Sequence, residues 1–135
     1  MAKTLEPNYI YKLVPHTSPP PEPPLPECLP LSELDRTSGF IHLSTASQVR
    51  GTLERFFTDD PCVYVLKIPY GAVKADIRWE NPERSVCGDR PGEGTFPHLY
   101  NGGKLGSAHV ESVAKWENKG GWDQALENAQ AWLTF

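Results

Sequence analysis

One short run of apolar residues limits the folds open to this chain more than any other feature. Residues 62–68, CVYVLKI, are almost continuously apolar and stand between Pro61 and Pro69. A run of this length is typical of a β-strand that is covered on both faces. Residues 9–14, YIYKLV, predict a second strand that ends at Pro15. The chain is therefore expected to build a sheet that is packed on both sides.

Helices and shorter strands are predicted around this sheet. Thr45 or Ser47 is suited to cap a helix. The apolar positions of that helix recur at spacings of three and four residues: Val49, Leu53, Phe56 and Phe57. An amphipathic C-terminal helix is predicted over residues 122–133. The remaining short elements are a helical turn, an edge strand and a closing strand, at residues 32–35, 77–80 and 109–116.

Two segments between these elements are expected to be loops. Seven prolines fall between residues 19 and 30, which excludes helix and sheet ladders and favours polyproline II. We expect this proline-rich loop to be a stiff surface segment that contributes little to the core. Docking of the loop into an aromatic groove of a partner is the alternative. Residues 81–95 are rich in Gly, Pro and charge, and predict a mobile loop that is the natural candidate for a lid.

Length, charge and cysteine content limit the functional classes. The 135 residues suit a single domain, 1–135, and a net charge of −4 without charge runs disfavours strong nucleic-acid binding. Three cysteines without C-x-x-C spacing favour neither a disulfide framework nor a zinc site. No apolar run approaches the roughly 18 residues of a membrane span, and the N-terminus lacks a secretory pattern. We expect a cytoplasmic protein, whose oligomeric state the sequence leaves open.

Two strings carry the candidate chemistry: residues 39–45, GFIHLST, and residues 96–100, FPHLY. Each places a histidine between apolar neighbours and close to hydroxyl groups. In an extended chain, alternation sends Phe40, His42 and Ser44 to one face. Histidine titrates near pH 6.5, so His42 and His98 are candidates for proton transfer or ligand binding. The alternative is that each ring is a hydrogen-bonded structural residue.

The order and spacing of four strings resemble a known family. GFIHLSTASQV, ERFF, IRWE and FPHLY resemble the proteins grouped as domain of unknown function 952, and the resemblance covers roughly residues 9–113. Members of this family are similar to a compact form of the ADP-ribosyltransferase fold, which holds NAD in toxins and in the RNA 2′-phosphotransferase. The resemblance implies an α+β domain with a split, mostly antiparallel sheet and two or three helices.

The same resemblance implies a ligand site. It places the strands of His42 and His98 side by side, with a cleft between the two strings for a nucleotide-like ligand and NAD as the first candidate co-substrate. His42 matches the residue that holds the ribose. Ser44 or Thr45 matches the group that contacts nicotinamide, and Tyr100 is suited to stack on a ring.

A glutamate that orients the ribose 2′-hydroxyl is the remaining requirement of that fold. Glu80, Glu93 and Glu111 are the candidates, and Glu80 is preferred because it belongs to the IRWE string. Arg78 is suited to neutralise a phosphate, with Trp79 beside it in the site. A structural strand edge explains Arg78 and Trp79 equally well.

Two further functions stay open. His42 and His98 could form a general acid–base pair that acts without a cofactor on a small ester, lactone or nucleotide. Without a G-x-S-x-G string, serine-hydrolase chemistry is disfavoured, and the histidines lack a spacing typical of metal ligands. The non-enzymatic alternative is a binding module that senses a nucleotide or metabolite. Release of nicotinamide from NAD would separate transfer from sensing.

Overall fold

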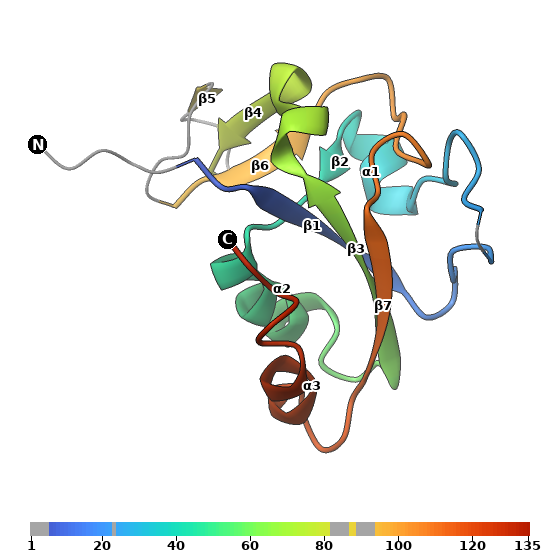
Figure 1. Cartoon of the computed structure of the whole chain (residues 1–135), viewed down its shortest axis with the longest axis vertical. Helices are drawn as coiled ribbons and strands as arrows, with labels where there is room; N and C mark the ends of the chain where they lie inside the picture. Colours follow the sequence, from blue (N-terminus) through green and yellow to red (C-terminus); the bar gives the residue numbers. More distant parts are fainter. Residues whose placement is uncertain (1–5, 23, 82–86, 89–93) are drawn as a thin grey trace, which may run out of the picture.

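The computed structural model describes residues 6–22, 24–81, 87–88 and 94–135, and arranges its strands in two antiparallel sheets (Figure 1). Sheet A has the order β1 (Tyr9–Pro15), β3 (Cys62–Pro69) and β7 (Ser112–Glu117). Sheet B has the order β2 (Ile41–His42), β6 (Phe96–Leu99), β4 (Ile77–Glu80) and β5 (Cys87–Gly88). This arrangement confirms an α+β class with a split antiparallel sheet.

Strand β3 lies at the centre of sheet A and is covered on both faces, as its apolar run predicted. Val63 and Val65 belong to a first core, which sheet A forms with the helices below it in Figure 1. Leu66 and Ile68 belong to a second core, which sheet A shares with sheet B. All four side chains are fully buried. Burial on alternating faces is what a strand does when each of its two faces meets a separate apolar layer.

Two short helices flank the GFIHLST string. Helix α1 (Glu33–Ser38) is capped at its N-terminus by Ser32, whose Oγ accepts a hydrogen bond from the Asp35 N–H at 3.1 Å. Its C-cap is Gly39, with φ of 83°. A 3-10 turn, η1 (Ala46–Gln48), leads into α2 (Val49–Phe56). The apolar face of α2 buries Val49 and Leu53, but Phe56 is 69% exposed, contrary to the prediction from its spacing. The turns η2 (Tyr70–Ala72) and η3 (Lys74–Asp76) connect β3 to β4.

The C-terminal helix is shorter than predicted. Helix α3 spans Asp123–Asn128, and the chain then continues in turns rather than to residue 133. Side chains of sheet A hold this last segment: Lys67 Nζ donates to the Trp132 carbonyl at 2.7 Å. The Tyr11 hydroxyl donates to the Thr134 carbonyl at 2.6 Å and accepts from the Thr134 N–H at 2.8 Å. These tertiary bonds replace the bonds that a longer helix would have made.

Two strand predictions require correction. Strand β4 is not an edge, because it pairs with β6 on one side and β5 on the other. Strand β7 begins at Ser112 rather than at residue 109. The preceding residues form a turn in which the His109 N–H donates to the Gly106 carbonyl at 2.9 Å and His109 Nδ1 accepts from the Gly106 N–H at 3.1 Å.

The second half of the proline-rich loop is part of the packed domain, contrary to expectation. Leu29 of the loop, and Leu31 just after it, pack against the second core. The Leu29 N–H donates to the Leu105 carbonyl at 2.7 Å, and the Ser107 N–H donates to the Pro26 carbonyl at 2.9 Å. The stretch 19–22 is mostly exposed, as predicted. Of the expected lid, residues 82–86 and 89–93 lie outside the described residues.

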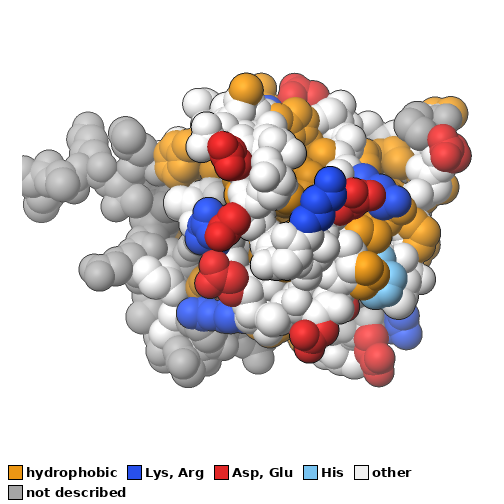
Figure 2. All heavy atoms as spheres, turned by 90° about the horizontal axis from the view of Figure 1, so that it is seen from below, with side chains coloured by type: hydrophobic (Ala, Val, Ile, Leu, Met, Phe, Trp, Pro, Cys, Tyr) orange, Lys and Arg blue, Asp and Glu red, His pale blue; other side chains and the backbone are white. Residues whose placement is uncertain are grey.

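The surface seen from the side of α2 and α3 carries charges of both signs, interspersed among polar groups (Figure 2). No patch of a single sign dominates this face. Among the helices that the structure describes, none is long and apolar enough to cross a membrane.

Gly106 provides a test of how tightly the proline-rich loop is held. A Cβ at Gly106 would lie 2.1 Å from the Glu27 carbonyl oxygen, so Gly106→Ala must displace the loop backbone. We expect Gly106→Ala to lower the free energy of unfolding by about 1–3 kcal/mol, as overpacking does. Gly51→Ala is the matched control, because Gly51 lies inside α2 with no atom within 4 Å of the added Cβ.

The control should raise the free energy of unfolding by about 0.5–1 kcal/mol through helix propensity. Urea unfolding of both variants measures the difference. Equal stability of the two variants would show that the loop is not packed against Gly106.

Candidate functional site

The two histidines lie on neighbouring strands. In the antiparallel pair β2–β6, His42 is opposite His98 and Ile41 is opposite Leu99. The centroids of the two imidazole rings are 5.2 Å apart, with an edge-to-face arrangement. The adjacency that the family resemblance implied is therefore present in sheet B.

Successive side chains of sheet B point to opposite faces, so one face contacts the second core and the other carries the site. Ile41, Leu99 and Trp79 point into the second core and are almost fully buried. The residues that alternate with them, among them His42 and His98, occupy the other face of the sheet. Because β2 and β6 are hydrogen-bonded neighbours, the two rings share one face and do not oppose each other across a cleft between the strings.

Asp35 on α1 forms the first histidine–carboxylate pair. Its Oδ1 accepts hydrogen bonds from His42 Nδ1 at 2.8 Å and from the His42 backbone N–H at 3.1 Å. Its Oδ2 accepts from Lys12 Nζ at 2.6 Å, and Lys12 Nζ also donates to the His42 carbonyl at 3.2 Å. Asp35 is only 2% exposed, so these donors replace the water that it loses on folding.

The two charges of this cluster titrate away from their ordinary ranges. Burial alone would raise the pKa of Asp35, but the hydrogen bond from His42 and the ammonium of Lys12 outweigh it, and the pKa is lowered. Burial lowers the pKa of Lys12, and the Asp35 carboxylate opposes that change only in part. The pair is thus a buried ion pair whose members depend on each other.

Glu80 on β4 forms the second pair. Its Oε1 is 2.8 Å from His98 Nδ1 and also accepts a short hydrogen bond from the Tyr100 hydroxyl. Glu80 and His98 are 5% and 6% exposed. Arg78, opposite His98 in the β4–β6 register, is exposed and lies with its guanidinium 6.0 Å from the centroid of the Tyr100 ring.

Phe40 holds the aromatic groups of the site together. Its ring stacks on His98 with centroids 4.4 Å apart, and lies 4.6 Å from the ring of His42 and 5.0 Å from that of Tyr100. Phe40 is itself 5% exposed. The orientation of both imidazoles is therefore set from two sides, by Phe40 and by a carboxylate.

This geometry defines what the histidines can do. A carboxylate bonded to Nδ1 fixes which nitrogen carries the proton, and Nε2 becomes the atom for proton transfer. The His42 side chain is 33% exposed, so its ring is accessible to solvent. The His98 side chain is only 8% exposed, so of the two rings, whose centroids are 5.2 Å apart, His42 is the one open to solvent. Together the rings form a candidate for general acid–base chemistry.

The remaining predicted residues lie away from the rings or face the core. Ser44 Oγ is 3.1 Å from Thr52 Oγ1, and the Thr45 N–H donates to Gln48 Oε1, so these two buried residues anchor α2 and η1. Trp79 is 1% exposed in the second core and donates through Nε1 to the Tyr70 hydroxyl at 3.1 Å. It does not line the site, because its position in β4 faces inward.

The two other glutamate candidates do not join the pair of rings. Glu111 precedes β7 in sheet A, where its N–H donates to the Lys67 carbonyl at 2.8 Å. Glu93 lies outside the described residues. Of the three, only Glu80 is seen to contact a histidine of the site.

Sequence reasoning missed Asp35 and Lys12. A signal for Lys12 was available, since it interrupts the otherwise apolar strand YIYKLV, where a buried charge requires a partner. Asp35 offered none, because the string SELDR reads as an ordinary exposed helical turn. Within the described residues, no three His, Cys, Asp or Glu side chains are arranged to hold a metal ion.

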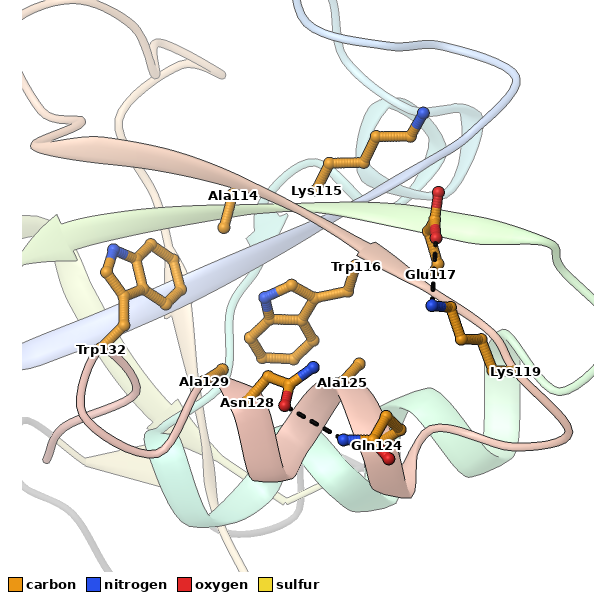
Figure 3. A pocket seen from close by; sticks show the side chains of 10 residues that line it. All are labelled: Ala114, Lys115, Trp116, Glu117, Lys119, Gln124, Ala125, Asn128, Ala129 and Trp132. Carbon is orange, nitrogen blue, oxygen red and sulfur yellow. Dashed lines mark hydrogen bonds and ion pairs between the residues drawn. The ribbon is translucent and has the colours of Figure 1, made fainter.

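An open hollow lies elsewhere on the molecule, between β7 and α3 (Figure 3). Trp116, Ala125 and Ala129 form its floor, and Lys115, Gln124 and Asn128 are among the polar residues around it. None of the predicted site residues lines this hollow. The hollow is therefore separate from the pair of histidines on sheet B.

The fold and the paired strands define a small α+β protein with two histidine–carboxylate pairs on one sheet face. The chain belongs to the family described as "Protein of unknown function (DUF952)", whose model matches residues 26–113. No curated protein matches it.

Solved structures of one bacterial protein share the fold. The crystal structure of protein CC0527 from Caulobacter crescentus is 21% identical, covers 88% of this chain and 98% of that chain, and has a TM-score of 0.63. The solution NMR structure of CC0527 is 23% identical, covers 83% and 87% of the two chains, and has a TM-score of 0.56. At this identity the likeness is one of fold alone.

The buried ion pair predicts how stability depends on pH. The pKa of Asp35 is lowered on folding, so its stabilising contribution is complete above the ordinary value of 3.8 and is lost as pH falls through the folded pKa. We expect Asp35→Asn to weaken this acid-dependent loss. At pH 7 it should lower the free energy of unfolding by about 3–5 kcal/mol, because Lys12 becomes an unpaired buried charge.

Asp123→Asn is the control, because Asp123 is 89% exposed and pairs with Arg50 at the surface. Its effect at pH 7 should stay below about 1 kcal/mol. Urea unfolding between pH 2 and pH 7 measures both variants. A similar pH profile for Asp35→Asn and the unmodified protein would contradict the assignment of the ion pair.

Proposed function

We propose that this protein is an enzyme that uses His42 and His98 as a general acid–base pair to hydrolyse a small ester, lactone or nucleotide, without a cofactor. The observation that carries the proposal is the pair of neighbouring imidazoles, each held through Nδ1 by its own buried carboxylate. Such a carboxylate selects the tautomer that carries its proton on Nδ1 and leaves Nε2 able to accept one. Positioned acid–base groups contribute roughly a hundred- to ten-thousand-fold in rate.

In the proposed step, one ring accepts a proton and the other donates one. One histidine, neutral, accepts a proton at Nε2 from a water molecule, whose oxygen forms a bond to the carbonyl carbon or phosphorus. The other histidine, protonated, donates its Nε2 proton to the leaving oxygen as the scissile bond breaks. Proton exchange with solvent then restores both rings.

Side chains next to the rings suit a small anionic or aromatic substrate. Arg78 supplies a positive charge at the exposed surface opposite His98, where an anionic group of the substrate would be attracted. Tyr100, half-buried beside it, offers an aromatic ring for stacking.

ADP-ribosyl transfer from NAD, on an ADP-ribosyltransferase-like fold, is the second candidate. The split antiparallel sheet and the adjacent strands of His42 and His98 favour it. That reaction needs a glutamate at the ribose, whereas Glu80 is buried and bonded to His98 and Tyr100. A non-catalytic module that binds a nucleotide or metabolite is the third reading of the same residues.

Asparagine variants test the acid–base proposal without removing the bonds that hold the site. His42→Asn and His98→Asn keep an N–H donor near the position of Nδ1 and remove Nε2. Purified protein is assayed against panels of chromogenic esters, lactones and cyclic nucleotides, and against NAD with nicotinamide as the product. We expect turnover in the first group, lowered by about 10²–10⁴-fold in each variant.

The double variant should lose little more activity than the worse single variant, because the two rings act as a unit. His16→Ala is the control, since His16 lies beside Asp60 and outside the site. Nicotinamide release would favour transfer instead. Binding of a nucleotide without turnover of any panel would favour the binding module, and activity retained in both asparagine variants would exclude the acid–base pair.

A further inference from the structure

Lys12 is the charged group of the site that the acid–base proposal leaves without a role. It lies on β1 between Ile10 and Val14, two residues of the second core, on the strand face that is turned toward sheet B. Its side chain is only 13% exposed. A buried ammonium is costly to maintain, so its retention next to His42 calls for a physical explanation.

Lys12 Nζ binds both Asp35, the partner of the His42 ring, and the His42 backbone. Lys12 Nζ and His42 Nδ1 bind different oxygens of the same carboxylate, at 2.6 Å and 2.8 Å. Lys12 Nζ is also 3.2 Å from the His42 carbonyl oxygen. The ammonium is thus held close to the histidine backbone, in a region where solvent screens charges weakly.

Electrostatics predicts the effect of this arrangement. A lone carboxylate beside a histidine stabilises the charged imidazolium. Here the positive charge of Lys12 offsets the negative charge of Asp35, so that protonation of His42 would give two positive charges around one carboxylate. Asp35 can then orient the ring and fix its tautomer without holding an extra proton on it.

Among the residues that the structure describes, the other titratable groups around His42 do not replace this effect. His98 on β6 faces the ring edge-to-face, and Glu80 and Arg78 on β4 lie one strand further, beside His98. A charged His98 would act in the same direction as Lys12, because it also disfavours a second proton on His42. Asp35 is the group in contact with His42 that Lys12 neutralises.

We propose that Lys12 is a positioning residue that keeps His42 uncharged near pH 7, which makes His42 the general base of the pair and His98 the general acid. The assignment of roles rests on the proposed function. The effect of Lys12 on the charge of His42 rests on geometry alone and can be measured without a substrate.

Nitrogen-15 NMR of the histidine rings provides that measurement. At pH 7 the ring of His42 should be neutral, with the proton on Nδ1, in the unmodified protein. In Lys12→Met and in Lys12→Gln, the midpoint of the His42 titration should move upward by about one pH unit, as for a carboxylate whose charge is no longer offset. Lys12→Arg, which keeps the charge, should leave the midpoint close to its original position.

Lys67→Met is the matched control. Lys67 is also a buried lysine of sheet A, but it lies on β3 and its ammonium binds the Trp132 carbonyl and the face of Tyr9. Its removal should not move the His42 midpoint. Thermal unfolding of each variant confirms that the titration is measured on folded protein.

The outcomes separate this inference from the proposed function. An unchanged or lowered midpoint in folded Lys12→Met or Lys12→Gln would overturn the inference. If both variants fail to fold, a charged His42 ring at pH 7 in the unmodified protein overturns it and a neutral ring supports it. If the midpoint moves but no panel substrate is turned over, the tuning by Lys12 stands and the enzymatic proposal falls.

With an active substrate, the pH profile adds an independent readout. The acid limb of kcat/KM should move upward with the His42 midpoint in Lys12→Met, since the base must be neutral to act. An acid limb that stays in place while the midpoint moves would remove His42 from the role of base.

Discussion

The buried carboxylate of Asp35 is the interaction on which the arrangement of the site depends. It receives one donor from β1 of sheet A and two from β2 of sheet B, while it is itself carried by α1. Strand β2 is two residues long and α1 is six, so neither element has enough backbone pairing to be held firmly by itself. A buried carboxylate requires hydrogen-bond donors in place of water. Because the donors to Asp35 come from β1 and β2, its hydrogen bonds join α1 to both sheets.

The opposite face of sheet B explains why the rings can be held rigidly without entering the core. Trp79, Leu99 and Ile41 fill the space between the sheets. Phe40 covers the rings from the other side, so the imidazoles lie between an aromatic ring and polar partners. The site is thus assembled mainly from strand alternation, and its polar groups avoid the cost of burial among aliphatic side chains.

The parts of this structure that the sequence predicts are those governed by local pattern. The apolar run of β3, the contact of Phe40 with His42 and the turn ending at Gly39 depend on neighbours in the chain. Ser44, expected beside them, is instead buried against Thr52 of α2. Asp35 was not predictable, because its burial follows from where a short helix docks. The end of α3 and the packing of the proline-rich loop were mispredicted for a related reason: bonds from Lys67 and Tyr11, and a close approach at Gly106, come from distant segments.

The hydrogen bonds between Tyr11 and Thr134 join residues 123 positions apart. Closing so long a loop costs conformational entropy, and these bonds form only after most of the chain between the two groups has been ordered. As the protein is synthesised, β1 emerges early, yet the Tyr11 hydroxyl cannot find this partner until residue 134 has left the ribosome. The first core, which includes Tyr11 and packs against Trp132, therefore stays incomplete on the growing chain until this last segment is available.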